Sequence, residues 1–149
     1  MARKNRAGQL DLTDFFQDHL ALIVPSSHRL SNFKSIHFRE ALSEEFVLME
    51  PSTALTNRLA ASAAQENCAL RVRMRMQGFD VVTRLVAAGL GVAVLPIEAI
   101  APQLASLSIR AVNLLDPWAH RTHRIATRTD SLLSPAAQAF VEELKSVSK

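Results

Sequence analysis

Residues 84–96, RLVAAGLGVAVLP, constrain the fold of this chain more than any other stretch. The segment has the pattern of an amphipathic helix that ends, a Gly-Leu-Gly break, and an apolar strand closed by proline. Two of the chain's four glycines stand in this break, because a helix that stops and enters a buried strand within a few residues needs the backbone freedom of glycine. The stretch therefore predicts a helix-to-strand corner of an α/β protein.

The length and composition are those of one globular domain. The chain has 149 residues, of which 48% are hydrophobic and 21% are charged, enough to bury one core. No apolar run approaches the ~20 residues that span a bilayer, and no apolar stretch follows the basic N-terminus as it does in a secretory signal. We expect a cytoplasmic protein with no membrane partner, in which residues 1–10 form a disordered segment ahead of one domain at 11–149.

Two apolar runs that end in proline predict buried strands. They are LALIVP at residues 20–25 and FVLMEP at residues 46–51, and a continuous apolar run is typical of a strand covered on both faces. The second run leads into a helix rich in alanine and leucine, with Ser52 or Thr53 as its N-cap. Residues 71–76, RVRMRM, alternate strictly, which predicts a half-exposed strand with its arginines on one side.

The rest of the chain continues the alternation of helices and strands. A short helix is expected at residues 97–104, stopped near Pro102, and two strands are expected at 107–114 and 120–128. A C-terminal helix follows, with Ser134 as its N-cap and a proline in its first position. This alternation predicts an α/β fold.

The basic residues and the glycines do not indicate a nucleic-acid, metal or nucleotide site. The formal net charge is +3, and the arginine-bearing strand at 71–76 lacks the interleaved aromatic residues, or the helix, that read nucleic acid. His120 and His123 flank arginines, but a metal site would need a third ligand nearby. The Gly-Leu-Gly break follows a helix and not a strand, so it is no dinucleotide-binding loop. We therefore predict neither a metal nor a cofactor.

Catalytic groups support only an alternative reading. Ser26 and His28 are neighbours in a loop, yet closeness in the sequence does not establish the nucleophile-to-base geometry that acyl transfer requires, and no GxSxG motif is present. Cys68 is the only cysteine, which excludes an intrachain disulfide and favours a structural thiol. A small α/β enzyme that uses Ser26, His28 or Cys68 remains the alternative to a binding protein.

Two expected helices begin directly after strands, and their first turns are the candidates for a binding site. One begins at Ser52 and Thr53, and the other begins at Gly78, Phe79 and Asp80. The N–H groups at such helix starts can hold the carboxylate or oxyanion of a small ligand, although helix capping alone also explains Ser52 or Thr53. We predict a cleft that the two helix starts share.

Four segments, in this order and spacing, resemble the effector-binding domain of LysR-type transcriptional regulators. They are DHLALIVPSSHRL, FVLMEPSTAL, GFDVVTRLVAAGLGVAVLP and LSPAAQAFVEEL. The resemblance covers residues 11–141, and the glycine corner and the last helix are its most specific parts.

The resemblance implies a fold like that of type 2 periplasmic binding proteins, in which two α/β lobes surround a cleft for a small effector. The chain matches the second lobe and the C-terminal helix, whereas most of the first lobe and the helix-turn-helix of the family are missing from the sequence. The resemblance also implies a cytoplasmic regulator that works as a dimer or tetramer. DNA would be contacted only through a helix-turn-helix absent from this chain.

In this family the stretch corresponding to Gly78, Phe79 and Asp80 belongs to the second-lobe wall of the effector cleft, with Ser52 and Thr53 as secondary candidates. We therefore predict an effector-sensing fragment of a LysR-type regulator that binds a small anionic metabolite, mediates oligomerisation and catalyses no reaction. A stand-alone interaction module, which pairs with full-length regulators through the strand at 71–76, is a further alternative.

Overall fold

The computed structural model describes residues 10–129 and 132–147. The chain divides into two compact units: unit 1 contains Met1–Asp18 and Arg121–Lys149, and unit 2 contains His19–His120. Residues 1–9 of the segment expected to be disordered lie outside the described residues, and Leu10 already begins a strand.

The sheet of unit 2 places a central strand antiparallel to its neighbours. Strand β1 (Leu10–Pro25) pairs with β5 (Ala93–Pro96) and β6 (Ile109–Leu114), and β2 (Ser35–Ile36) adds to β6 in parallel, in the order β2-β6-β1-β5. Strands β3 (Glu45–Met49) and β4 (Arg71–Met76) form a parallel pair, which a bridge between Phe46 and Val92 joins to the start of β5. All strands of unit 2 except β1 therefore run in the same direction.

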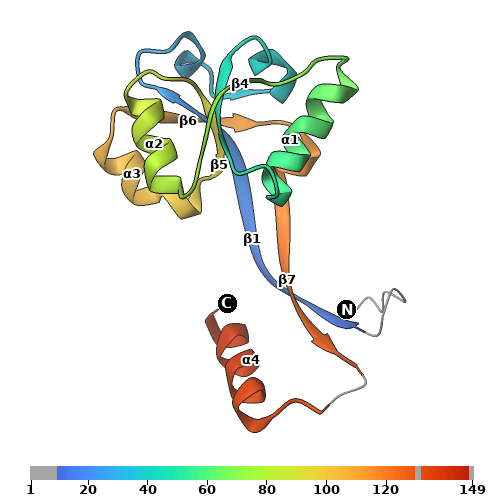
Figure 1. Cartoon of the computed structure of the whole chain (residues 1–149). Coiled ribbons are helices and arrows are strands. Elements are labelled where there is room, and N and C mark those ends of the chain that lie inside the picture. The colour runs from blue at the N-terminus through green and yellow to red at the C-terminus, as the bar shows by residue number, and fades with distance from the viewer. Residues whose placement is uncertain (1–9, 130–131, 148–149) are drawn as a thin grey trace. The chain divides into compact units, whose positions relative to one another are not determined.

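This common direction gives the sheet two distinct edges. We call the edge where β2, β3, β4, β5 and β6 end the carboxyl edge, and the edge where these strands begin the amino edge. Figure 1 shows the strands of unit 2 side by side, with helices on both sides of them. In open α/β sheets, ligands bind outside the carboxyl ends of the strands.

Helices α1 (Ala54–Gln65) and α2 (Phe79–Ala87) cover opposite faces of the sheet. Leu55 of α1 belongs to the buried cluster that contains Leu22 of β1, whereas Val82 of α2 belongs to a second cluster that contains Ile23. Adjacent residues of β1 thus enter different clusters. The prediction that residues 20–25 form a strand buried on both faces is confirmed, since Leu20 to Val24 are fully buried.

The Gly-Leu-Gly corner has the predicted form. Helix α2 ends in a Schellman motif, in which the N–H of Leu90 donates to the carbonyl of Leu85 (3.1 Å) and the N–H of Gly89 donates to that of Val86 (2.9 Å). Gly89 has φ +80°, the left-handed conformation that this motif requires. Gly91 then brings the chain close to the start of β3, where a Cβ at this position would lie 2.7 Å from the carbonyl oxygen of Glu45.

Three expectations from the sequence are corrected. Strand β1 begins at Leu10 and not near residue 20. Helix α3 (Ala101–Ser106) carries Pro102 in its first turn, where proline is tolerated, so Pro102 does not stop the helix. The strict alternation of β4 is interrupted, because its register with β3 shifts between Phe46 and Val47. The remaining short elements are 3₁₀ turns, namely η1 (Arg29–Asn32), η2 (Phe38–Ala41), η3 (Glu98–Ile100) and η4 (Pro117–Ala119).

In unit 1 the first part of β1 pairs with β7 (His120–Arg128), and helix α4 (Pro135–Val147) follows. Ser134 caps α4 as predicted, since its Oγ accepts a hydrogen bond from the N–H of Ala137 at 3.2 Å. No helix among the described residues is long and apolar enough to cross a membrane.

Asp18 ties the two strands of unit 1 together. Its buried carboxylate accepts two hydrogen bonds from the guanidinium of Arg121 and lies 2.9 Å from Nε2 of His123. Burial alone would raise the pKa of the Asp18 carboxyl, but the hydrogen bonds and charges of Arg121 and His123 outweigh burial and hold this pKa below its ordinary value.

Candidate functional site

The two loops singled out from the sequence leave the sheet at the carboxyl edge. Met49 at the end of β3 and Met76 at the end of β4 are Cα partners in the parallel pair. The segments that follow them, residues 50–53 and 77–80, therefore start next to each other. The sheet thus brings the beginnings of both predicted ligand segments to one edge, and their binding of a ligand remains a prediction.

At the start of α1 the side chains are used to cap the helix. Thr53 is the N-cap, and its Oγ1 accepts a hydrogen bond from the N–H of Thr56 at 3.1 Å. The Thr53 hydroxyl also donates to Oγ1 of Thr56 (2.8 Å), which in turn donates to the carbonyl of Met49 at 3.3 Å. Ser52 is exposed. Of the two candidates on this loop, Thr53 therefore caps α1, and Ser52 is the side chain that a ligand could reach.

The start of α2 is built differently, because its N-cap is a glycine. Gly78 has φ +84° and provides no side-chain cap, so the first N–H groups of the helix receive no side-chain acceptor there. Phe79 is half-buried and packs against the cluster beneath α2. Asp80 is exposed, and its Oδ1 accepts a hydrogen bond from Nε2 of Gln103 on α3. This helix start offers backbone donors and one carboxylate.

A cavity of about 570 Å³ opens at the same edge, near the ends of β5 and β6. Its walls include Ile97, Leu114 and Leu115, and two histidines, His19 and His120, whose Nδ1 atoms are 3.1 Å apart and share a hydrogen bond. Sequence reasoning missed this cavity. The two histidines are 101 residues apart, so no local sequence pattern predicts that they lie together.

The groups considered for catalysis are occupied or isolated. The ring of His28 is held at both nitrogens, since Nδ1 accepts from the N–H of Leu30 (3.2 Å) and Nε2 lies 3.2 Å from Glu44. Ser26 and Cys68 are exposed. The described residues contain no hydrogen bond between the Ser26 hydroxyl and His28, so they do not form a nucleophile and base pair.

His120 and His123, the two histidines considered as a metal pair, contact different side chains. His120 faces His19, whereas His123 faces Asp18. The residues that the structure describes contain no group of three or more His, Cys, Asp or Glu side chains able to hold a metal ion.

Comparison with known proteins places these observations in one family. The profile of the LysR substrate binding domain matches residues 1–149. The uncharacterized HTH-type transcriptional regulator YwbI of Bacillus subtilis is 30% identical over 130 residues, which cover 87% of this chain and 43% of the regulator. The chain therefore spans less than half the length of this relative.

Solved structures of similar fold are effector-binding domains. The regulatory domain of CcmR from Synechocystis PCC6803, in complex with 2-PG, has a TM-score of 0.84 and 19% identity over 100% of this chain and 72% of that chain. The effector-binding domain of QuiR in complex with shikimate has a TM-score of 0.80 and 16% identity over 99% of this chain and 69% of that chain. These likenesses support the α/β fold of type 2 periplasmic binding proteins.

Proposed function

The chain belongs to the LysR substrate binding domain family, and from this premise we propose that it senses a small anionic effector at the carboxyl edge of unit 2. The observation that carries the proposal is the start of α2. Its N-cap is Gly78 without a capping side chain, so the first N–H groups and the positive end of the helix dipole are available to an anion. Effector sensing, and not DNA reading, is the role that we assign to these residues.

Unit 2 would be the second lobe of the effector-binding domain, and α4 of unit 1 would be its C-terminal helix, within one partial domain at residues 11–149. The compact division at His19 and His120 supports this assignment. In this arrangement the effector shifts the equilibrium between two domain states because it binds one of them better.

Each of the predicted ligand residues would make a different contact with the effector. The N–H groups of Phe79 and Asp80 would hold an oxyanion, the Phe79 ring would form an apolar wall, and Ser52 would add a hydroxyl. The second oxygen of Asp80 can accept a hydrogen bond from a ligand hydroxyl. Shikimate, the molecule bound to the QuiR domain, is a carboxylate that bears hydroxyl groups and suits such a site.

Thermal unfolding of the full chain with shikimate, aromatic acids and inorganic oxyanions tests this site. A ligand at 100 times its dissociation constant should stabilise the folded chain by about 2.7 kcal/mol. Phe79→Pro removes the N–H at the first helical position, which tolerates proline, whereas Phe79→Ala removes only the ring. We expect the proline variant to lose more of the ligand-induced stabilisation than the alanine variant.

Equal stabilisation of the two variants by the ligand would count against a role for the N–H group of Phe79. Stabilisation by none of the three classes of anion would count against an anionic effector at this edge.

We further propose that this chain catalyses no reaction and acts in the cytoplasm as part of an oligomer. The occupied ring of His28 and the exposed, isolated Cys68 support the absence of catalysis. Val72 on β4 is 39% exposed, and the outer side of this strand has no β-partner among the described residues, which makes β4 the candidate subunit edge. Sedimentation of the full chain with and without Val72→Lys tests that edge, because the lysine should shift an oligomer toward the monomer.

A further inference from the structure

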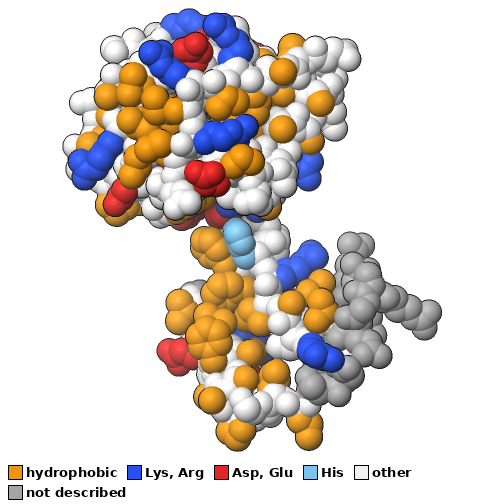
Figure 2. All heavy atoms as spheres, viewed as in Figure 1, with side chains coloured by type: hydrophobic (Ala, Val, Ile, Leu, Met, Phe, Trp, Pro, Cys, Tyr) orange, Lys and Arg blue, Asp and Glu red, His pale blue; other side chains and the backbone are white. Residues whose placement is uncertain are grey.

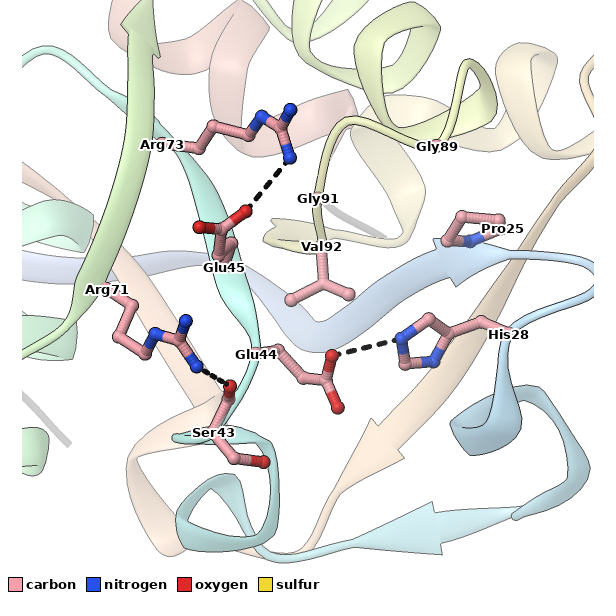
Figure 3. A pocket seen from close by; sticks show the side chains of 10 residues that line it. All are labelled: Pro25, His28, Ser43, Glu44, Glu45, Arg71, Arg73, Gly89, Gly91 and Val92. Atoms are coloured by element: carbon pink, nitrogen blue, oxygen red, sulfur yellow. Dashed lines mark hydrogen bonds and ion pairs between the residues drawn. The ribbon is translucent and has the colours of Figure 1, made fainter.

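A second cavity lies at the amino edge of unit 2, where β3, β4 and β5 begin. It has a volume of about 420 Å³, and Figure 3 shows the side chains that surround it. Arg71 and Arg73 of β4 line one side, and the Gly89–Gly91 corner lines another. Because all these strands run in the same direction, this pocket is at the opposite edge from the predicted effector site.

The two arginines keep hydrogen-bond donors for a ligand. Arg71 donates from Nη1 to the carbonyl of Ser43 (2.8 Å), and Arg73 donates from Nη1 to Oε2 of Glu45 (2.9 Å). A guanidinium has five N–H donors, so most of the donors of both side chains are not used in these contacts. The contacts fix one end of each guanidinium at the pocket and leave the rest of it for an acceptor.

The spacing of the two arginines along β4 brings both of them to the same pocket. In the register of the parallel pair, Phe46 is opposite Val72 and Val47 is opposite Met74, so Arg73 has no Cα partner. In a strand, residues two positions apart, such as Arg71 and Arg73, point to the same face. Bulges re-aim side chains and are over-represented next to binding sites.

The glutamates at this edge do not cancel the charge of the arginines. Both oxygens of Glu44 are occupied, one by Arg29 and the other by His28 at 3.2 Å, and Glu45 pairs with Arg73. Arg29 does not line the pocket but neutralises Glu44, so Arg71 is left as a pocket arginine with no carboxylate partner among the described residues. Figure 2 shows basic and acidic side chains next to each other on unit 2. The guanidinium of Arg71 therefore carries a positive charge that a negative group of a ligand can balance.

The glycine corner leaves space for the ligand. A Cβ at Gly89 would meet no atom within 4 Å, so the corner is open at that point. The cavity is larger than a single oxyanion needs, since a water molecule takes up only about 30 Å³ of liquid. The pocket can hold the body of a small organic molecule beside its charged group.

We propose that the amino-edge pocket is a second ligand site, which binds a small organic anion through the guanidinium groups of Arg71 and Arg73. The ligand's oxyanion takes charge-assisted hydrogen bonds from both arginines, and its body lies toward Gly89 and Val92. Carboxylate and phosphate groups share the required chemistry. This site is separate from the proposed effector site.

Glycine amide resonances can test the two sites at once. The chain has four glycines, of which Gly89 and Gly91 line the amino-edge pocket and Gly78 is at the carboxyl edge. The full chain, labelled with ¹⁵N-glycine, is titrated with succinate, with inorganic phosphate, and with sodium chloride as the ionic-strength control. We expect succinate or phosphate, but not chloride, to shift the signals of Gly89 and Gly91, and the effective anion distinguishes a carboxylate from a phosphate ligand.

Variants on the same strand complete the test. Arg73→Gln and Arg71→Gln should each weaken the titration at Gly89 and Gly91 by about tenfold, the loss expected for a charged hydrogen bond. Arg75→Gln is the matched control, because Arg75 is an exposed arginine of β4 that does not line the pocket, and it should leave the titration unchanged.

Three results would overturn the second site. They are the absence of any shift at Gly89 and Gly91 beyond that caused by chloride, a titration that Arg73→Gln and Arg71→Gln leave intact, and an equal loss in Arg75→Gln. A shift confined to Gly78 would support the proposed effector site while it overturns this one. A shift confined to Gly89 and Gly91 would support the amino-edge site and would exclude succinate and phosphate as ligands of the proposed effector site.

Discussion

The carbonyl oxygen of Glu45 occupies the place where residue 91 would carry a side chain, since a Cβ on Gly91 would lie 2.7 Å from it. The same oxygen accepts the N–H of Val92 at 2.9 Å. One close approach therefore both requires a glycine and joins the β3–β4 pair to the rest of the sheet.

Gly91→Ala should lower the free energy of unfolding by about 2–3 kcal/mol, because the new Cβ meets a backbone oxygen that cannot turn away and the φ of +152° is strained for alanine. Urea unfolding of the full chain, followed by circular dichroism, measures this change. Gly89→Ala is the control. It adds a Cβ in open space at φ +80° and should cost only about 1 kcal/mol. Equal costs for the two variants would mean that the contact with Glu45 is not the reason for the glycine.

Local patterns predicted the elements whose cause is local. The apolar run at residues 20–25, the N-cap Ser134 and the glycine corner were all predicted, because burial, capping and backbone freedom leave marks in neighbouring residues. The bulge at Arg73 was not predicted. A shift of register depends on the partner strand, and RVRMRM keeps its alternation in sequence whether or not its partner slips.

Features that depend on contacts between distant parts of the sequence could not be predicted from local patterns. The first part of β1 mixes apolar and polar residues without a continuous apolar run, and its strand is defined by pairing with β7. Asp18 of β1 and Arg121 of β7 are 103 residues apart in the sequence. The carboxyl-edge loops could be chosen from the sequence because each follows a strand, whereas the amino-edge pocket combines residues of several elements.

Asp18 should make the stability of the chain depend on pH in the acid range. Its folded-state pKa lies below the ordinary value, so the ionised carboxylate contributes its full stabilisation above about pH 4, and this contribution is lost as the pH falls through the folded-state pKa. Asp18→Asn should cost about 3 kcal/mol at neutral pH, because it leaves Arg121 without its partner. The variant should also show a smaller loss of stability between neutral and acid pH.

The free energy of unfolding of each variant is measured at neutral and at acid pH, and Asp14→Asn is the matched control. Asp14 pairs with Arg124, but its side chain is 72% exposed, and exposed ion pairs contribute about 0–1 kcal/mol. If Asp14→Asn changed the pH dependence of stability as strongly as Asp18→Asn, the contacts of Asp18 with Arg121 and His123 would not be the cause of that pH dependence.

Variants of the loop before α1 should show that Thr53 caps the helix and that Ser52 does not. Thr53→Ala removes the hydroxyl that accepts the N–H of Thr56 and should lower the free energy of unfolding by about 1 kcal/mol. Ser52→Ala should leave unfolding unchanged, because Ser52 is exposed and does not cap the helix. Chemical denaturation of both variants measures this. The reverse order would move the N-cap to Ser52.

Cys68 gives a direct test of the proposal that the chain acts by binding. The thiol is exposed, so iodoacetamide should alkylate it in the folded chain. Since Cys68 lines neither the amino-edge pocket nor the cavity at the carboxyl edge, alkylation should leave the succinate, phosphate and shikimate titrations unchanged, and Cys68→Ser should alter stability by no more than about 0.5 kcal/mol. Mass spectrometry of the alkylated chain, followed by the glycine titrations, measures both effects. Loss of ligand binding on alkylation would place the thiol at a ligand site, and turnover of an ester that disappears on alkylation would favour the enzyme alternative.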